Sequence, residues 1–225
     1  MLCADWKQPF PFRFGAGAEQ PHRLSLVACD DPQRVRVEAF IHERFQAMHH
    51  ADIHHFLPEL LALQDAEGTL NAAIGTRPVA GTQAFLEQYL DDPVQQVIAQ
   101  MTGQTVPRRT VVEVGNLAAS SSGSARLLIV AMTWLLAERG LEWVVFTGAA
   151  SLLNSFHRLG LEPLVLGAAD PARLTRDASD WGSYYAHKPQ VYAGNIRGGL
   201  QRLQRQGVLE RLGFPRSVLE AAHAA

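Results

Sequence analysis

The sequence contains little cysteine, little lysine and no excess of positive charge, and each shortage excludes a class of protein. Cys3 and Cys29 are its two cysteines, too few for the disulfide framework of a small secreted domain. Lysine occurs only at positions 7 and 188, and the net charge is −2. A general nucleic-acid-binding protein carries a basic field that this composition lacks. We therefore expect no nucleic acid among the partners.

A long apolar run is also missing. The longest one spans residues 127–137 and is interrupted only by Thr133, which is about half of the ~20 residues that a membrane-spanning helix needs. At the N-terminus, charge and proline come before any apolar run of signal-peptide length. We expect a cytoplasmic protein.

The 225 residues are enough for one large domain that buries about 70% of its unfolded surface without help from disulfides or metal. Residues 1–22 carry proline, glycine and aromatics without periodicity and read as an irregular arm. An α/β domain is expected over 23–194, and a helical extension over 195–225.

Apolar periodicity predicts alternating strands and helices. Strands are expected at 23–28, 58–63, 70–76, 110–117, 142–147, 163–166, 183–186 and 190–193. Helices are expected at 33–48, 85–100 with a break at Pro93, 125–139, 149–159, 195–206 and 215–222. Because Pro58 cannot donate to a ladder, it is expected either on an edge strand or at the start of its strand. This order indicates a mixed α/β sheet with helices on both faces.

Residues 110–166 read as strand–helix–strand–helix–strand, a parallel-type crossover unit. The first strand-to-helix loop of such a unit is the usual position for a ligand. Here that loop is Ser120–Ser124, which combines small side chains, a glycine and the unpaired amides of a helix start. It predicts a cradle for an anion, with a polar helix cap that binds nothing as the alternative.

The loop, together with Phe156 and the Leu159-Gly160-Leu161 that follows it, resembles the GNAT acyltransferases, which bind pantetheine pyrophosphate at the loop after their fourth strand. This resemblance implies an acyl-CoA or acyl-phosphopantetheine donor. Phe156 stands where the family commonly has a phenol that protonates the departing thiolate; a thiol with a pKa near about 8.5 can leave without that donor. The resemblance implies these cofactor-binding residues: Gly115, Leu117, Ser121, Ser122, Gly123, Ser124, Ala125, Asn154 and Phe156.

The N-terminal half is similar to the acyl-homoserine-lactone synthases, a GNAT-like branch that uses acyl carrier protein and S-adenosylmethionine. Arg36 with Phe40 one helical turn later, and Arg77 at a strand end, match residues of that family. Glu113 also matches, whereas Asn116 stands in the place of an arginine. The resemblance implies acyl carrier protein as a partner and S-adenosylmethionine as a further cofactor.

The whole chain resembles most closely the family called thermostable hemolysin, over roughly residues 34–196. The matching pieces are 85–90, 112–118, 143–147, 154–156 and 181–185, followed by Pro189. The family name records a lytic phenotype, whereas the fold implies an acyltransferase. We favour an enzyme that moves an acyl group from a coenzyme A or carrier-protein thioester to an amine acceptor, such as one derived from an amino acid.

Two residues of the predicted strand 110–117 are the candidate catalytic groups. Glu113 is a carboxylate on an otherwise apolar strand beside the cradle, suited to accept a proton from an amine nucleophile. The alternative is a structural ion pair with Arg36 or Arg77. Asn116 either donates to the thioester carbonyl or satisfies the backbone of a bulge that Gly115 marks.

Arginines and aromatics are the candidate groups for the acceptor. A guanidinium can bind an acceptor carboxylate in a bidentate manner, and surface pairing is the alternative for each arginine. Tyr184 and Tyr185 are expected to alternate on a strand, so that one of them faces inward. The candidate substrate-binding residues are Arg36, Phe40, Arg77, Tyr89, Trp181 and Tyr184.

Histidines gather after the first predicted helix, at positions 42, 49, 50, 54 and 55. His50 and His54 have the i,i+4 spacing of a helical metal site. Their pattern matches no closed zinc site and neither cysteine is near in the sequence, so we predict no metal.

Two other functions are retained. The helix at 195–206 has Ile196, Leu200 and Leu203 opposite its arginines, as in a helix that lies on a bilayer. That pattern is also normal for a helix packed on a core, which we favour over a membrane-associated or lytic protein. A GNAT-like module that binds a ligand without catalysis is the other alternative.

Overall fold

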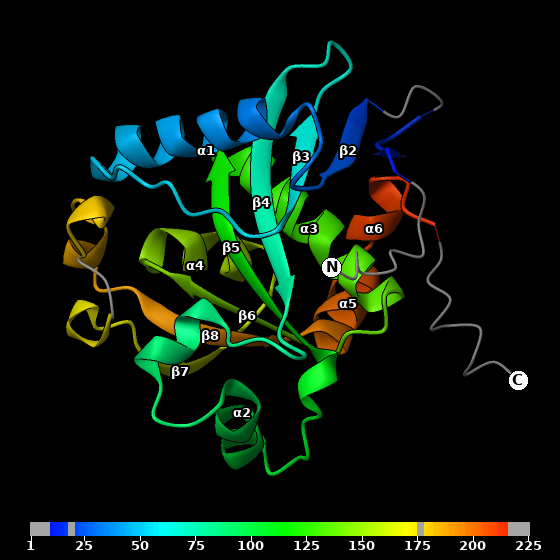
Figure 1. Ribbon diagram of the computed structural model, residues 1–225. Coiled ribbons are helices and arrows are strands. Elements are labelled where there is room, and N and C mark those ends of the chain that lie inside the picture. The colour runs from blue at the N-terminus through cyan, green and yellow to red at the C-terminus, as the bar shows by residue number, and fades with distance from the viewer. Residues whose placement is uncertain (1–9, 18–20, 175–177, 216–225) are drawn as a thin grey trace, which may run out of the picture.

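The structure, a computed structural model, describes residues 10–17, 21–174 and 178–215 and contains one eight-stranded sheet (Figure 1). Its strands are β1 (Phe12–Phe14), β2 (His22–Val27), β3 (Glu59–Gln64), β4 (Leu70–Pro78), β5 (Val111–Ala119), β6 (Trp143–Gly148), β7 (Leu164–Ala168) and β8 (Gln190–Asn195). Their order across the sheet is β1-β2-β3-β4-β5-β6-β8-β7.

Helices connect and cover these strands. The α-helices are α1 (Arg34–His49), α2 (Val94–Thr102), α3 (Ser122–Glu138), α4 (Ala150–Arg158), α5 (Ile196–Arg205) and α6 (Val208–Arg211). Short 3₁₀ turns are η1 (Phe85–Tyr89), η2 (Arg108–Thr110), η3 (Pro171–Arg173), η4 (Ala178–Trp181) and η5 (Tyr184–His187). Among the described residues, no helix has both the length and the apolar character needed to cross a bilayer.

The sheet opens between its two parallel central strands. β5 and β6 pair only where residues 111–113 face residues 143–145. Beyond this point β5 continues along β4 as far as Ala119, while β6 continues along β8 as far as Gly148. The two strands therefore diverge toward their carboxyl ends, where α3 and α4 begin.

Helices lie on both faces, as predicted. All residues of β3 are buried. Leu60 and Ala62 pack in the cluster that includes α1, and Leu61 and Leu63 pack on the other face in the cluster that includes α3. A strand buried on both faces belongs in the middle of a sheet. Of the two positions predicted from Pro58, the strand start is the one observed: β3 begins at Glu59, directly after the proline, and lies between β2 and β4 rather than at an edge.

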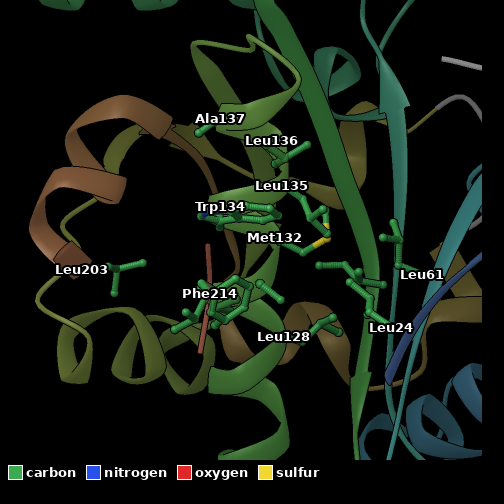
Figure 2. Close-up of a cluster of buried hydrophobic side chains, with 14 of the residues drawn as sticks. Leu24, Leu61, Leu128, Met132, Trp134, Leu135, Leu136, Ala137, Leu203 and Phe214 are labelled. Carbon is green, nitrogen blue, oxygen red and sulfur yellow. The ribbon is translucent and has the colours of Figure 1, made fainter. Parts of the chain in front are cut away.

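The largest core lies between α3 and the sheet, with Trp134 at its centre (Figure 2). Trp134 is fully buried; its ring lies 5.0 Å from that of Phe12 and 5.5 Å from that of Phe214. Its indole N–H donates to the carbonyl of Pro215 at 3.2 Å. α3 is apolar all round because the sheet covers one side and α5 the other.

Several boundaries differ from the predictions. Residues 12–14 of the predicted irregular arm form β1 and pair with β2. The predicted strand 183–186 is the 3₁₀ turn η5. The predicted helix 85–100 is broken at Pro93, as expected, into η1 and α2. The predicted helix 215–222 lies outside the described residues except for Pro215.

Candidate active site where the central strands diverge

A cavity of about 990 Å³ fills the opening between β5 and β6 and extends beyond it on both faces of the sheet. It is lined by β5, β6, one side of α3, α4, α5, the end of α1 with the connection that follows it, and the segment around Trp181. Its size is at the upper end of the range for ligand pockets. Three parts of its wall differ in chemistry.

The strand β5 enters the cavity wall with a bulge. Its register against β4 shifts between the pairs Ala73–Ala118 and Gly75–Gly115, and Asn116 has a left-handed backbone with φ of 53°. The bulge that Gly115 predicts is therefore present. A Cβ on Gly75 would lie 2.8 Å from Leu57 Cβ and 3.0 Å from Asn116 Oδ1, so this close approach requires glycine.

The side chain of Asn116 holds the connection between α1 and β3. Its Oδ1 accepts from the amide of Leu57 at 2.9 Å, and its Nδ2 donates to the carbonyl of His55 at 3.1 Å. These bonds correspond to the structural alternative for Asn116, in which the amide satisfies backbone beside the bulge.

Glu113 lies at the point where β5 and β6 part, with a side chain that is 5% exposed. Its carboxylate accepts from Arg77 Nε at 3.0 Å and from Arg77 Nη2, and also from the amides of Phe85 and Leu86 at 3.0 and 2.9 Å. The buried pair expected as the alternative to a base is thus formed, and its partner is Arg77. Arg36 lies elsewhere, with Nη2 3.3 Å from the carbonyl of Gly68.

The start of α3 forms the polar mouth of the cavity. Ser121 caps the helix by accepting from the Ser124 amide at 3.0 Å. The amides of Ser122 and Gly123, in the first turn, have no carbonyl partner within the helix. Ser121, Ser122 and Ala125 line the cavity. A helix start with small side chains attracts phosphate oxygens.

The deeper part of the cavity is apolar. Ile129, Met132 and Leu136 line it from α3, one helical turn or less apart, and Val144 and Phe146 line it from β6. Phe156 of α4 closes this part by stacking on Phe146, with ring centres 4.9 Å apart. An extended hydrocarbon chain fits the chemistry of this wall.

The opposite end of the cavity has an aromatic wall. Trp181 lies against Tyr184 and Phe85, with ring centres 5.3 and 6.0 Å apart. Burial is the main cause that raises the pKa of Tyr184 to about 12, so its phenol stays protonated at neutral pH. Tyr185 lies beside Tyr184, since a 3₁₀ turn does not place successive side chains on opposite faces as a strand does. The hydroxyl of Tyr185 is 2.6 Å from the hydroxyl of Tyr89.

His49, the last residue of α1, also lines this end. Burial, and then the nearby His187, lower the pKa of its imidazole below the ordinary value. Its buried Nδ1 makes no hydrogen bond within the described part of the chain. Its ring contacts those of Tyr184 and His187, with centres 5.3 and 5.6 Å away.

The cavity brings together most of the residues singled out in the sequence, but not all. Those that line it are Arg77, Glu113, Gly115, Asn116, Leu117, Ser121, Ser122, Ala125, Phe156, Trp181 and Tyr184. Those outside its lining are Arg36, Phe40, Tyr89, Gly123, Ser124 and Asn154. Asn154 is exposed on α4, and Phe40 packs against the core under α1.

Several lining residues were not predicted. Arg44 and His49 come from the end of α1, residues 55–57 from the connection after it, and Arg202 and Arg205 from α5. The polar face of α5 was visible in the sequence, but what this face borders depends on how the helix packs. The apolar face is buried, with Ile196, Leu200 and Leu203 in the core, as expected for a packed helix.

Three comparisons relate the chain to known proteins. A family model described as thermostable hemolysin matches residues 27–200. No curated protein matches the chain.

Solved structures share the architecture at low identity. FeeM, an N-acyl amino acid synthase from uncultured soil microbes, matches with a TM-score of 0.56 and 13% identity over 84% of this chain and 99% of that one. The CoA-dependent acyl-homoserine lactone synthase BjaI, solved with SAM and isopentyl-CoA, matches with a TM-score of 0.54 and 11% identity over 89% of this chain and 98% of that one. The acyl-homoserine-lactone synthase LasI matches with a TM-score of 0.53 and 8% identity, over 78% and 90%. These matches confirm the predicted GNAT-like fold.

Proposed function

The chain belongs to the thermostable hemolysin family, and on this premise we propose that it is an N-acyltransferase that moves an acyl group from a phosphopantetheine thioester to an amine. The observation that carries the proposal is the cavity between the diverging strands β5 and β6, with the start of α3 at its mouth and an apolar chamber behind. An acyl thioester needs these three surfaces in this order: a phosphate cradle, a cleft for an amide-containing arm and a space for hydrocarbon.

The donor arm would lie along the free edge of β5. Past residue 113 this edge has lost its β6 partner, so its backbone groups are available to the amides of pantetheine, as a strand edge is to a peptide. Phosphate oxygens would meet the first-turn amides of α3. The acyl chain would pass between Met132 and Phe146 into the apolar chamber.

The acceptor would enter from the aromatic end. Arg44 and Arg77 line the cavity there, and Arg77 is held by Glu113 with a quarter of its side chain still exposed. A guanidinium fixed in this way suits a carboxylate. We therefore propose an amine that bears a carboxylate, such as an amino acid or a derivative of one.

The reaction is direct attack. The neutral amine nitrogen adds to the thioester carbonyl, the carbon–nitrogen bond forms, and the carbon–sulfur bond breaks with its electron pair going to sulfur. The nitrogen gives one proton to the base, and the departing thiolate takes up one proton. We assign the proton-accepting role to His49, because its lowered pKa keeps the imidazole neutral at pH 7. Glu113, the base predicted from sequence, already accepts four hydrogen bonds, which favours a positioning role through Arg77.

The direct test is turnover by the purified chain. Acyl-CoA donors from two to sixteen carbons, and the same acyl groups on acyl carrier protein, would each be offered with amino acids and with S-adenosylmethionine. Release of thiol and the mass of an N-acyl product would be measured. We expect thiol release that depends on the amine, with a preference for longer acyl chains because of the apolar chamber.

A variant that blocks the cavity, paired with a matched control, tests whether turnover takes place there. Ala125→Phe would fill the mouth beside the start of α3, and Ala39→Phe would place the same ring on the exposed side of α1. We expect the first change to abolish turnover and the second to leave it intact. Absence of thiol release with every donor, together with no protection of Ala125 by bound acyl-CoA in hydrogen exchange, would overturn the proposal.

The lytic alternative has no comparable support. The apolar face of α5, which prompted it, is packed in the core with Leu200 and Leu203 at most 2% exposed, so this face is not available to a bilayer in the folded chain. Leakage of anionic vesicles caused by the purified protein would revive this reading.

A further inference from the structure

A second cluster of polar side chains lies on the outer side of the connection between α1 and β3. His42 of α1 and Asp52 and His54 of the connection present three ligand atoms that all lie within 4.8 Å of one another. Alternate residues of the connection, Ala51 and Ile53, are buried. Because an extended chain turns successive side chains to opposite sides, Asp52 and His54 both face His42.

The tautomer of His42 is fixed by its own neighbour. His42 Nδ1 lies 3.0 Å from the carbonyl oxygen of Ile53, which can only accept, so this nitrogen carries the proton. A neutral imidazole then has its lone pair on Nε2. That atom lies 3.6 Å from Asp52 Oδ1, too far for a hydrogen bond. A lone pair and a carboxylate oxygen thus face each other, and a cation between them would remove the repulsion.

The distances match the size of a metal ion. Zinc binds imidazole nitrogen at about 2.0–2.1 Å and carboxylate oxygen at about 2.0–2.2 Å, so a tetrahedral angle places the two ligand atoms about 3.4 Å apart. The nitrogen–oxygen distances here are 3.6 Å from His42 and 3.0 Å from His54. The His42 and His54 nitrogens lie within 4.8 Å of each other, so a bound ion would draw the two rings together until all three atoms share one coordination sphere.

We propose that His42, Asp52 and His54 bind one divalent transition-metal ion of the zinc type, with its fourth position open to water. Two imidazoles and one carboxylate favour zinc over calcium or magnesium, which prefer oxygen ligands. The carbonyl of Ile53 orients His42 as the outer partner of a metal-bound imidazole does. This inference stands independently of the proposed acyl transfer.

The metal would fasten the cavity wall to α1. The connection continues from His54 into residues 55–57, which line the cavity, and the amide of Asp52 donates to the carbonyl of Asp180 at 2.7 Å. The site therefore joins three segments that meet at the aromatic end: α1, the connection and the turn η4. Binding would order all three without a new contact inside the cavity.

Periodicity in the sequence directs attention to the wrong pair. His50 and His54 would share a face only if α1 continued, but the helix ends at His49 and His50 has a left-handed backbone with φ of 53°. The sequence signal for this site is a different one. A histidine on a helix is followed by an extended segment that contains Asp-x-His, in which x is apolar.

The test is calorimetric titration of Zn²⁺ into chelator-treated, untagged protein in a Cys3→Ser/Cys29→Ser background, which removes competing thiols. We expect one ion per chain, with binding weakened at least tenfold in His42→Ala and in His54→Ala. His157→Ala, an exposed histidine on α4, is the control and should bind as the parent does. Zinc at 100 times its Kd should also raise Tm by about 5 °C in the parent and the control.

Equal zinc binding by His42→Ala, His54→Ala and the control would overturn the proposal, and so would no binding by the parent. Hydrogen exchange provides a second readout that does not depend on how stable a variant is. Zinc should slow exchange of the amides at 51–57 in the parent and leave those of α2, which lies far from the cluster, unchanged. Slowing spread evenly over the chain would contradict a local site.

Discussion

At the scale of single residues, the cavity shows why a charged side chain on an apolar strand has two interpretations. Glu113 accepts from Arg77 and from two amides at the start of η1, so it fixes the cavity wall as well as the arginine. The buried Nδ1 of His49 has no hydrogen-bond partner among the described residues, and burial lowers the pKa of this imidazole. The rings of Tyr184 and His187 contact its imidazole.

The pH dependence of turnover separates these two residues. If His49 accepts the proton, the rate rises with pH through its lowered pKa and is flat above it, because the neutral form is the active one. His49→Gln should lower kcat by about 10²–10⁴-fold and remove that acid limb. Glu113→Gln should raise KM for a carboxylate-bearing amine and keep the limb at the same pH.

The opposite pattern would identify Glu113 as the base. In that case Glu113→Gln would abolish the acid limb and His49→Gln would retain it. The readout is the pH at which the acid limb of the rate profile lies. The KM of Glu113→Asp does not separate the two roles, because aspartate and glutamate can both pair with Arg77.

At the scale of elements, the sequence predicted most strands and helices because their apolar periodicity reflects one packing face each. It failed where tertiary contacts override that pattern. Residues 183–186 look β-prone, yet they turn so that Tyr185 can reach Tyr89, a contact between positions far apart in the chain. Pro58 left two positions open for β3, at an edge or starting directly after the proline, and burial on both faces decides for the second. The bulge, in contrast, was predictable from Gly115.

An ion pair between elements secures η1 and α2. Glu87 accepts from both terminal nitrogens of Arg108 at 2.6 and 2.8 Å. It also accepts from the amides of Ala84, the residue before η1, and Val94, the first residue of α2. Burial opposes ionisation of Glu87, but these hydrogen bonds prevail and hold the pKa of its carboxyl below the ordinary value.

Removing the arginine tests this interpretation. Arg108→Met should lower the free energy of unfolding by about 2–3 kcal/mol, because it leaves a buried carboxylate without its cation. Arg109→Met, at an exposed neighbour, is the control and should change it little. Chemical denaturation at pH 7 measures both.

The sign of the pH effect follows from the lowered pKa. Glu87 contributes stability that is fully present above the unfolded-state pKa and is lost as pH falls through the folded-state pKa. Arg108→Met should therefore lose less stability than the parent on acidification. A parallel decline in both proteins would contradict the assignment.

At the scale of the whole molecule, the two ends of the described chain meet. Phe214 lies with ring centres 4.8 Å from Phe14 and 5.7 Å from Phe12, and the amide of Gly15 donates to the carbonyl of Leu212 at 2.7 Å. These contacts cover Trp134 (Figure 2). The two segments are short and lie about 200 positions apart in the chain, so apolar periodicity does not predict their contact.

Phe214→Ala should lower the free energy of unfolding by about 3–5 kcal/mol, the cost of a large cavity in an aromatic cluster. Thermal unfolding measures this change. Val35→Ala, at a side chain that is 76% exposed, is the control and should have little effect. A loss below about 1 kcal/mol for Phe214→Ala would show that the C-terminal segment adds little to the fold.

The backbone of Gly182 has a consequence for how acceptor preference can change. A Cβ there would lie 2.2 Å from the carbonyl oxygen of His49, and the next amide, that of Ser183, donates to the same oxygen at 2.7 Å. The Ser183 hydroxyl donates to this oxygen as well, at 3.0 Å. Gly182 and Ser183 thus clamp the turn to the end of α1, and the clamp does not use the aromatic side chains of Trp181 and Tyr184. Its aromatic residues can be exchanged for others while the clamp persists. Under the proposed function, a swap of this turn alone would change the acceptor and leave the donor side of the cavity as it is.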